Sequence, residues 1–190
     1  MARLVLFMLE LEALSQRGQI NSKSLTVRKA VYPRSTIANV KQVEKKIPMT
    51  GYYTNEAEIE SVVQGFESCM TAKDDFSHAS HLTVAVFYLY ELGEPQATEK
   101  MRAGLLRFLN HHGIGPSKFH ETLTVFWIKL VRAFLLQLQP QTSLVAMTNA
   151  VIERARSSRL VFEYYSEELL KSDGARKSWI EPDLKDLTGH

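Results

Sequence analysis

The stretch Phe119–Gln139, FHETLTVFWIKLVRAFLLQLQ, decides the fold class because its apolar side chains recur at intervals of three and four residues. The apolar positions are Leu123, Trp127, Leu130, Val131, Phe134 and Leu138. An α-helix has about 3.6 residues per turn, so this spacing places them along one side of a helix. Pro140 follows and ends it. The stretch therefore predicts a long amphipathic helix packed against other helices.

The residues before this stretch predict three further helices. The first begins after the capping residue Asn55 and keeps apolar side chains on one face as far as Met70. The second runs from about His78 to Leu92, and the third begins at Pro95 and stops at Gly113. No segment alternates polar and apolar residues for long enough to predict a sheet.

The residues after Pro140 predict a fifth helix and a helical tail. The fifth helix runs from about Thr142 to Ser158, where apolar residues again repeat at helical spacing. Ser166 and Asp173 are suited to cap two short helices, and Pro182 ends the second. We therefore predict an all-α antiparallel bundle of about five helices with a short helical C-terminal tail.

Charge divides the 190 residues into two parts. Residues 1–48 hold nine Lys and Arg against three Glu, whereas residues 49–190 hold fourteen against eighteen Asp and Glu. The first part has no sustained period, so we expect a basic, flexible extension before a bundle domain at 49–190. Its opening apolar run is interrupted by Glu10 and Glu12, unlike a signal peptide or a membrane span. Met49 suits a natural start of the protein, a hypothesis that an intact mass from the native source would test.

Composition and motifs exclude several classes of protein. The single cysteine, Cys69, excludes a disulfide framework and predicts a reducing compartment, hence a cytoplasmic protein. The sequence has neither a Gly-rich phosphate loop nor a Gly-x-Ser-x-Gly nucleophile motif. The net negative charge of the bundle domain argues against a nucleic-acid partner. We expect a partner that is a metal ion or a small molecule, with no nucleic acid and no membrane, and the oligomeric state stays open.

Histidines mark the one place where polar chemistry is concentrated. Helix phase puts His78, His81 and His120 on buried faces and turns His112 inward. In an up-and-down bundle, the start of the second helix, the end of the third and the start of the fourth lie at one end. The four imidazoles are therefore expected to gather there.

Two readings of these histidines remain open. In the first, His78, His81 and His120 bind a divalent transition metal or a small polar ligand. His120 and Glu121 would then carry protons, as the catalytic residues of an enzyme do. The known patterns do not fit, because Thr124 stands where a zinc protease needs a second histidine. In the second reading, the domain is non-catalytic, and its histidines form a buried hydrogen-bond network or serve a partner interface.

Three other residues are candidates for binding a cofactor or ligand. Trp127 shares a helix face with His120, so its indole could line an apolar pocket. The tail carries Tyr165 and Arg176, which could close over that pocket and donate to a ligand. The alternative is a tail that only packs its aromatic side chains over the bundle.

Four segments carry a resemblance to a family. FSHASHLTVAVFYL, KFHETLTVFW, YYSEELL and GARKSWIEPDL resemble an uncharacterised family of small bacterial helical proteins. Its motifs are Phe-x-His-x-x-His-Leu, His-Glu-Thr-Leu-Thr-x-x-Trp and Ala-Arg-x-x-Trp-x-x-Pro-Asp. The match covers roughly residues 56–187, so the resemblance implies the same domain boundary and motifs, without implying an activity.

Overall fold

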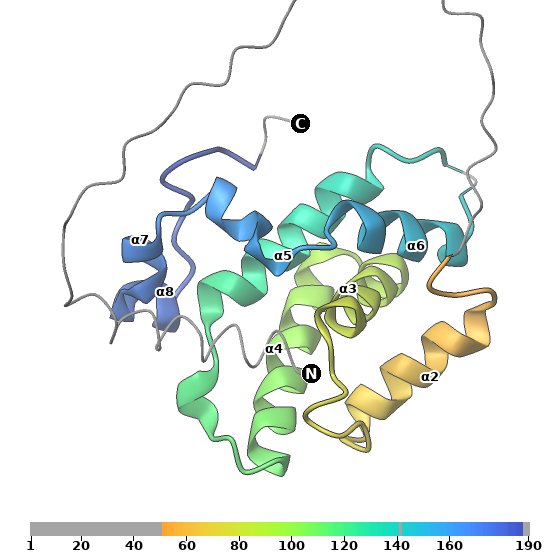
Figure 1. Cartoon of the computed structure of the whole chain (residues 1–190), viewed down its shortest axis with the longest axis horizontal. Helices are drawn as coiled ribbons and strands as arrows, with labels where there is room; N and C mark the ends of the chain where they lie inside the picture. Colours follow the sequence, from red (N-terminus) through yellow and green to blue (C-terminus); the bar gives the residue numbers. More distant parts are fainter. Residues whose placement is uncertain (1–50, 141, 188–190) are drawn as a thin grey trace, which may run out of the picture.

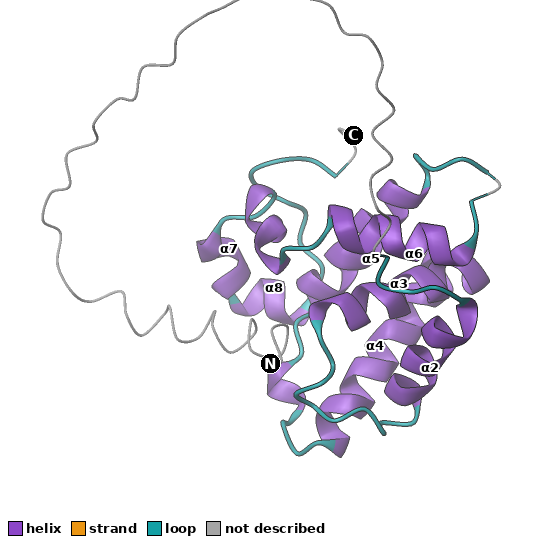
Figure 2. Ribbon diagram, turned by 45° about the vertical axis from the view of Figure 1, so that its right-hand side comes forward, coloured by secondary structure: helices purple, strands orange, loops and turns teal. Residues whose placement is uncertain are grey.

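The computed structural model describes residues 51–140 and 142–187, and every regular element within these ranges is helical (Figure 1; Figure 2). The prediction of an all-α bundle is confirmed. The expected extension, residues 1–48, and the proposed start at Met49 lie outside the described residues.

Five longer helices form the bundle, and two short ones form the tail. The longer ones are α2 (Glu56–Glu67), α3 (His78–Leu92), α4 (Glu94–His111), α5 (Glu121–Leu135) and α6 (Leu144–Arg154). The short ones are α7 (Glu167–Lys171) and α8 (Asp173–Lys177). Single stretches of 3-10 helix, Pro116–Lys118 and Ser158–Glu163, precede α5 and α7.

Local capping explains most helix ends. The Asn55 side chain accepts from the Glu58 backbone N–H at 3.1 Å, as the sequence predicts, and starts α2. Ser166 starts α7 in the same way. Gly93 has a φ of 75°, which an L side chain rarely adopts, and it turns the chain from α3 directly into α4. Pro95 then occupies the first turn of α4.

Two helices end earlier than predicted, α5 at Leu135 rather than at Pro140 and α6 at Arg154 rather than near Ser158. Four further predicted boundaries are corrected by the structure. The first helix ends at Glu67, so Met70 is 81% exposed rather than inward, and Cys69 leaves the helix with a φ of 57°. The other three corrections concern the residue at which a helix begins. In each case, a side chain that accepts a first-turn backbone N–H starts the helix at a different residue from the predicted one. These capping residues are His120 for α5, Ser143 for α6 and Ser172, not Asp173, for α8.

Helix α3 is the centre of the bundle. It contacts α2, α4, α5 and α6, and it lies among them in both ribbon views (Figure 1; Figure 2). Its residues Leu82 to Val86 are all buried, although successive residues point in different directions around a helix. The sequence there is apolar on every side, as expected for a helix surrounded by others. The prediction of one buried face for this helix was therefore too narrow.

The tail covers the first turns of α5. Thr122 Oγ1 donates to the Ser178 carbonyl at 2.8 Å and accepts from the Ile180 N–H at 3.2 Å. Nearby, the Tyr165 hydroxyl donates to the Ile180 carbonyl at 2.7 Å. These bonds fix the segment after α8 against the bundle.

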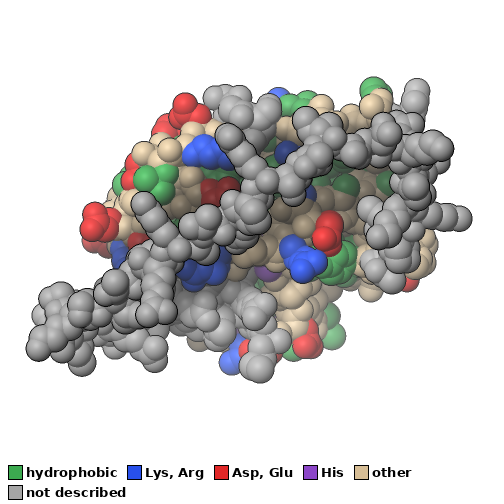
Figure 3. Space-filling view, turned by 45° about the horizontal axis from the view of Figure 1, so that its top comes forward, with side chains coloured by type: hydrophobic (Ala, Val, Ile, Leu, Met, Phe, Trp, Pro, Cys, Tyr) green, Lys and Arg blue, Asp and Glu red, His purple; other side chains and the backbone are tan. Residues whose placement is uncertain are grey.

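Helix length and surface charge give two further facts about the described residues. None of the helices in residues 51–140 and 142–187 has both the length and the apolar character that crossing a bilayer requires. Where the described surface is visible in Figure 3, acidic and basic side chains are interspersed.

Candidate histidine site

His78 and His81 lie in the first turn of the central helix. Ser77 caps α3 by accepting from the Ser80 N–H at 3.1 Å, which places His78 at the first helical position. His78 is 7% exposed and His81 is 1% exposed. The predicted burial of both imidazoles is therefore confirmed.

The contacts of His78 define its protonation. Its Nε2 lies 2.9 Å from the Ala155 carbonyl oxygen, which can only accept, so Nε2 carries the hydrogen. In the neutral ring Nδ1 then keeps a lone pair, and this buried atom has no hydrogen-bond partner within residues 51–140 and 142–187. The His78 ring also meets the Trp127 ring edge-on, with centroids 4.7 Å apart. Burial lowers the pKa of His78, and the Ala155 carbonyl opposes that effect in part.

His81 is the most isolated polar side chain of the site. Both of its ring nitrogens are buried, and neither has a hydrogen-bond partner among the residues that the structure describes. Burial, together with the neighbouring His78, lowers the pKa of His81 to about 3. The ring is therefore neutral at physiological pH, and it offers one N–H donor and one lone pair.

Trp127 adds a further unpartnered nitrogen. Trp127, the predicted pocket residue, is 1% exposed and packs edge-on against the Phe126 ring, with centroids 5.0 Å apart. Its buried Nε1 has no hydrogen-bond partner among the described residues. Indole nitrogen is only a donor. His78, His81 and Trp127, which we call the histidine site, thus hold two donors and two lone pairs without protein partners.

His120 has a different role from the one predicted. It precedes α5 as its capping residue, where Nδ1 accepts from the Leu123 N–H at 3.3 Å. Its Nε2 lies 2.8 Å from the Leu170 carbonyl and therefore donates to it. Both nitrogens are occupied, and burial lowers the pKa of this ring as well. His120 is buried as predicted, at 1% exposed, but it has no free atom for a ligand.

The predicted three-histidine metal set is not brought together. Within the part of the chain that the structure describes, no three His, Cys, Asp or Glu side chains are grouped so that they could hold a metal ion. The His112 ring packs against the Phe108 ring at 4.3 Å and against the ring of the exposed His111 at 4.9 Å. The expected gathering of four imidazoles is thus reduced to one adjacent pair, His78 and His81.

Glu121, the predicted general base, is held in an ion pair. Arg102 Nε donates to its two carboxylate oxygens at 2.7 and 2.9 Å, and Arg102 Nη2 also donates to Oε1. The same guanidinium pairs with Glu99. A carboxylate bound on two sides by a guanidinium is poorly placed to take a proton from a substrate.

Tyr165 and Arg176 also have partners within the protein. Tyr165 is fully buried, its hydroxyl donates to the Ile180 carbonyl at 2.7 Å, and burial raises its pKa. Arg176 Nη1 donates to the Ser117 carbonyl at 3.3 Å. These contacts are those of a tail that packs over the bundle, the alternative that the sequence left open.

Several residues that matter for the site were missed from the sequence. The carbonyls of Ala155 and Leu170 hold two of the histidines, and backbone acceptors leave no trace in side-chain identity. Arg102 was also missed, because it is one of several charged residues on the amphipathic helix α4 and nothing in the sequence marks it as the partner of Glu121. The unpartnered nitrogens become visible only when all neighbours are known.

Comparison with known proteins finds no family model, no curated protein and no solved structure that matches this chain. The geometry of the described residues is therefore the basis of the functional argument.

Proposed function

We propose that the protein binds a small, uncharged polar molecule in its interior, at the histidine site. The observation that carries the proposal is His81, which is 1% exposed and has two buried ring nitrogens without a protein partner. Buried polar atoms are almost always hydrogen-bonded, and leaving one unsatisfied costs about 1 to 3 kcal/mol. A molecule that supplies these bonds would remove that cost.

The protonation of the site sets the chemistry of the ligand. The pKa values of His78 and His81 are both lowered, so the site is uncharged near neutral pH. Trp127 Nε1 donates, His78 Nδ1 accepts, and His81 does one of each. A neutral molecule that carries both donors and acceptors, such as an amide or an alcohol, is complementary to this set.

A divalent transition metal, held by His78 and His81 alone among the described residues, is a second candidate ligand that we propose for the same site. The bond from His78 Nε2 to the Ala155 carbonyl is of the kind that orients a metal-binding imidazole and leaves Nδ1 free. His81 would be the second protein ligand. Because His120 and Glu121 are held by protein partners, we propose binding and not catalysis.

The alternative function, a non-catalytic helical domain with structural histidines, rests on a separate observation. His78 and His120 each donate to a backbone carbonyl, of Ala155 and Leu170 respectively, and so join distant segments. In that case His81 is a buried polar residue satisfied by water. We also propose that the protein is located in the reducing cytoplasm, because the buried Cys69 is free. Both functions are compatible with that location.

Substitution of His81 separates the two functions. For the full chain without added ligand, we expect His81→Leu to raise the free energy of unfolding by about 1 to 3 kcal/mol, because it removes two unsatisfied nitrogens. Thermal unfolding with acetamide or with Zn²⁺ is the measurement of binding. A probe at a hundred times its Kd would stabilise the wild type by about 2.7 kcal/mol.

The matched control is His111→Leu, at an exposed position. It is expected to leave both unfolding and the response to the probes unchanged, whereas His81→Leu removes the response. Native mass spectrometry of the wild type would also show a retained ligand. A wild type that carries no ligand and gains no stability from either probe, together with a destabilised His81→Leu, would establish the structural alternative.

A further inference from the structure

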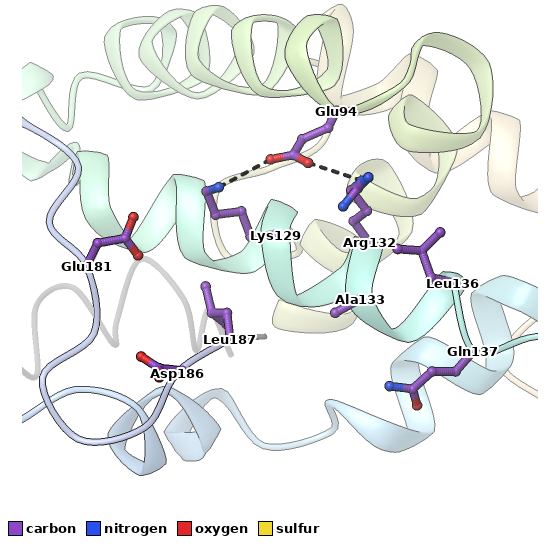
Figure 4. A pocket seen from close by; sticks show the side chains of 9 residues that line it. All are labelled: Glu94, Lys129, Arg132, Ala133, Leu136, Gln137, Glu181, Asp186 and Leu187. Carbon is purple, nitrogen blue, oxygen red and sulfur yellow. Dashed lines mark ion pairs between the residues drawn. The ribbon is translucent and has the colours of Figure 1, made fainter. Parts of the chain in front are cut away.

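A pocket separate from the histidine site lies on the outer side of α5. It has a volume of about 560 Å³ and is enclosed by the first turn of α4, the exposed face of α5 and the C-terminal segment 181–187 (Figure 4). Ligand pockets typically have volumes of about 300 to 1,000 Å³. The described chain thus offers a cavity of suitable size away from the histidines, which we call the charged pocket.

One side of the charged pocket is basic. Lys129 and Arg132 extend from α5 toward Glu94, at N–O distances of 3.4 and 3.1 Å (Figure 4). Two cations share this single carboxylate, so the group keeps a net positive charge. The side chains of Lys129 and Arg132 are 37% and 49% exposed, which leaves both accessible to a ligand.

The other side of the charged pocket is acidic. Glu181 and Asp186 come from the C-terminal segment (Figure 4). The ion pairs that Lys129 and Arg132 make in this pocket are with Glu94, not with these two carboxylates. Glu181 Oε1 accepts from the Trp179 indole N–H at 2.9 Å, which fixes its position at the edge. Both acidic residues are exposed.

Apolar side chains complete the lining of the charged pocket, and Leu136 lies beyond Arg132, away from Glu181 and Asp186 (Figure 4). Ala133 and Leu136 come from α5 and Leu187 from the C-terminal segment. Leu136 is 68% exposed, so an apolar group in the pocket would cover surface that is now in contact with water. The charged pocket therefore combines a positive side, a negative side and an apolar contact.

We propose that the charged pocket binds a zwitterion of the α-amino acid class. The ligand carboxylate would face Lys129 and Arg132, its ammonium would face Glu181 and Asp186, and an apolar side chain would contact Leu136. A ligand with a single charge would be attracted by one side and repelled by the other. This inference is independent of the histidine site.

Calorimetric titration of the full chain with L-leucine tests the proposal. N-acetyl-L-leucine lacks the ammonium and L-leucinamide lacks the carboxylate, so each is expected to bind at least ten times more weakly than leucine. Trp179 is a second readout, because its N–H binds Glu181 and the Lys129 ammonium lies 5.5 Å from its ring. Leucine is expected to change its fluorescence.

Variants locate the binding. Asp186→Asn and Lys129→Met are each expected to weaken leucine binding at least tenfold, whereas Glu168→Gln, at an exposed position on α7, leaves it unchanged. His81→Leu is also expected to leave it unchanged, which distinguishes this inference from the proposed function. The inference is overturned if leucine does not bind, if the three compounds bind equally, or if His81→Leu and not Asp186→Asn removes binding.

Discussion

The imidazole of His120 and the backbone carbonyl of Leu170 are joined by a hydrogen bond of 2.8 Å, across fifty residues of sequence. The same ring caps α5 through its other nitrogen, which accepts from the Leu123 N–H. One neutral side chain therefore starts the helix and attaches α7 to it. This double role explains why the residue is buried beside Glu121 without taking part in the histidine site.

Loss of the His120 side chain should destabilise the fold. His120→Ala removes a cap and leaves the Leu170 carbonyl without its donor, so the free energy of unfolding should fall by about 2 to 4 kcal/mol. His120→Asn should recover the cap alone and lose about half as much. Urea unfolding measures both, with the exposed His111→Ala as control. A loss below about 0.5 kcal/mol, typical of surface substitutions, would contradict this role.

The pairing of Arg102 with Glu121 should also contribute to stability. The Glu121 side chain is only 11% exposed, so Glu121→Gln leaves the Arg102 guanidinium without the negative charge and with one acceptor oxygen instead of two. We expect a loss of about 1 to 3 kcal/mol in urea unfolding. Glu99→Gln removes the other partner of the same guanidinium, whose side chain is 74% exposed, and should cost less than about 1 kcal/mol. Equal losses in the two variants would show that burial does not distinguish the pairs.

Local signals in the sequence were sufficient for the bundle and for many helix ends. Asn55, Gly93, Pro95 and Ser166 act where they were expected, because capping and turn chemistry depend on a few neighbouring residues. His120 was expected inside a helix, since histidine is not among the common capping residues. The cap became evident only from the position of its ring.

The candidate site was only partly predictable. Helix phase correctly buried His78 and His81, but periodicity assumes one exposed face, and α3 contacts four other helices and is buried on every side from Leu82 to Val86. Whether a buried imidazole is satisfied depends on atoms far away in sequence, such as the Ala155 carbonyl for His78. The contrast between a bonded His120 and an unbonded His81 is therefore a property of the tertiary structure.

Close packing of α2 on α4 gives a prediction about Gly104. A Cβ at this position would lie 2.6 Å from Cε1 and 2.8 Å from Cζ of the Phe66 ring. That ring is held by stacking on Phe76, with centroids 4.8 Å apart, and by Phe108. Overpacking costs about 1 to 3 kcal/mol, which should exceed the gain of about 1 kcal/mol from replacing a helical glycine.

A double-mutant cycle tests that explanation. Gly104→Ala alone should lower the urea midpoint, whereas the same change in a Phe66→Leu background should be neutral or stabilising, because the ring that clashes is gone. If Gly104→Ala lowers stability equally in both backgrounds, the Phe66 contact is not the cause.

Acid should weaken the fold through its buried histidines. The pKa of His81 is about 3 in the folded protein, and those of His78 and His120 are also lowered. An unfolded histidine has a pKa of about 6.5, so below this pH the unfolded chain binds protons that the folded chain does not. The stabilisation is complete above about pH 6.5 and is lost as the pH falls toward 3.

For His81 alone, the free energy of unfolding should fall by about 1.4 kcal/mol for each pH unit below 6.5. Urea unfolding at pH 7.5, 6.5, 5.5 and 4.5 gives the slope for the wild type and for His81→Leu, and their difference isolates this residue from the carboxylates that also titrate at low pH. The wild-type curve should be steeper by about that amount, because Leu binds no proton in either state. Parallel curves for wild type and His81→Leu would contradict this prediction, because they would mean that His81 is protonated equally in the folded and the unfolded protein.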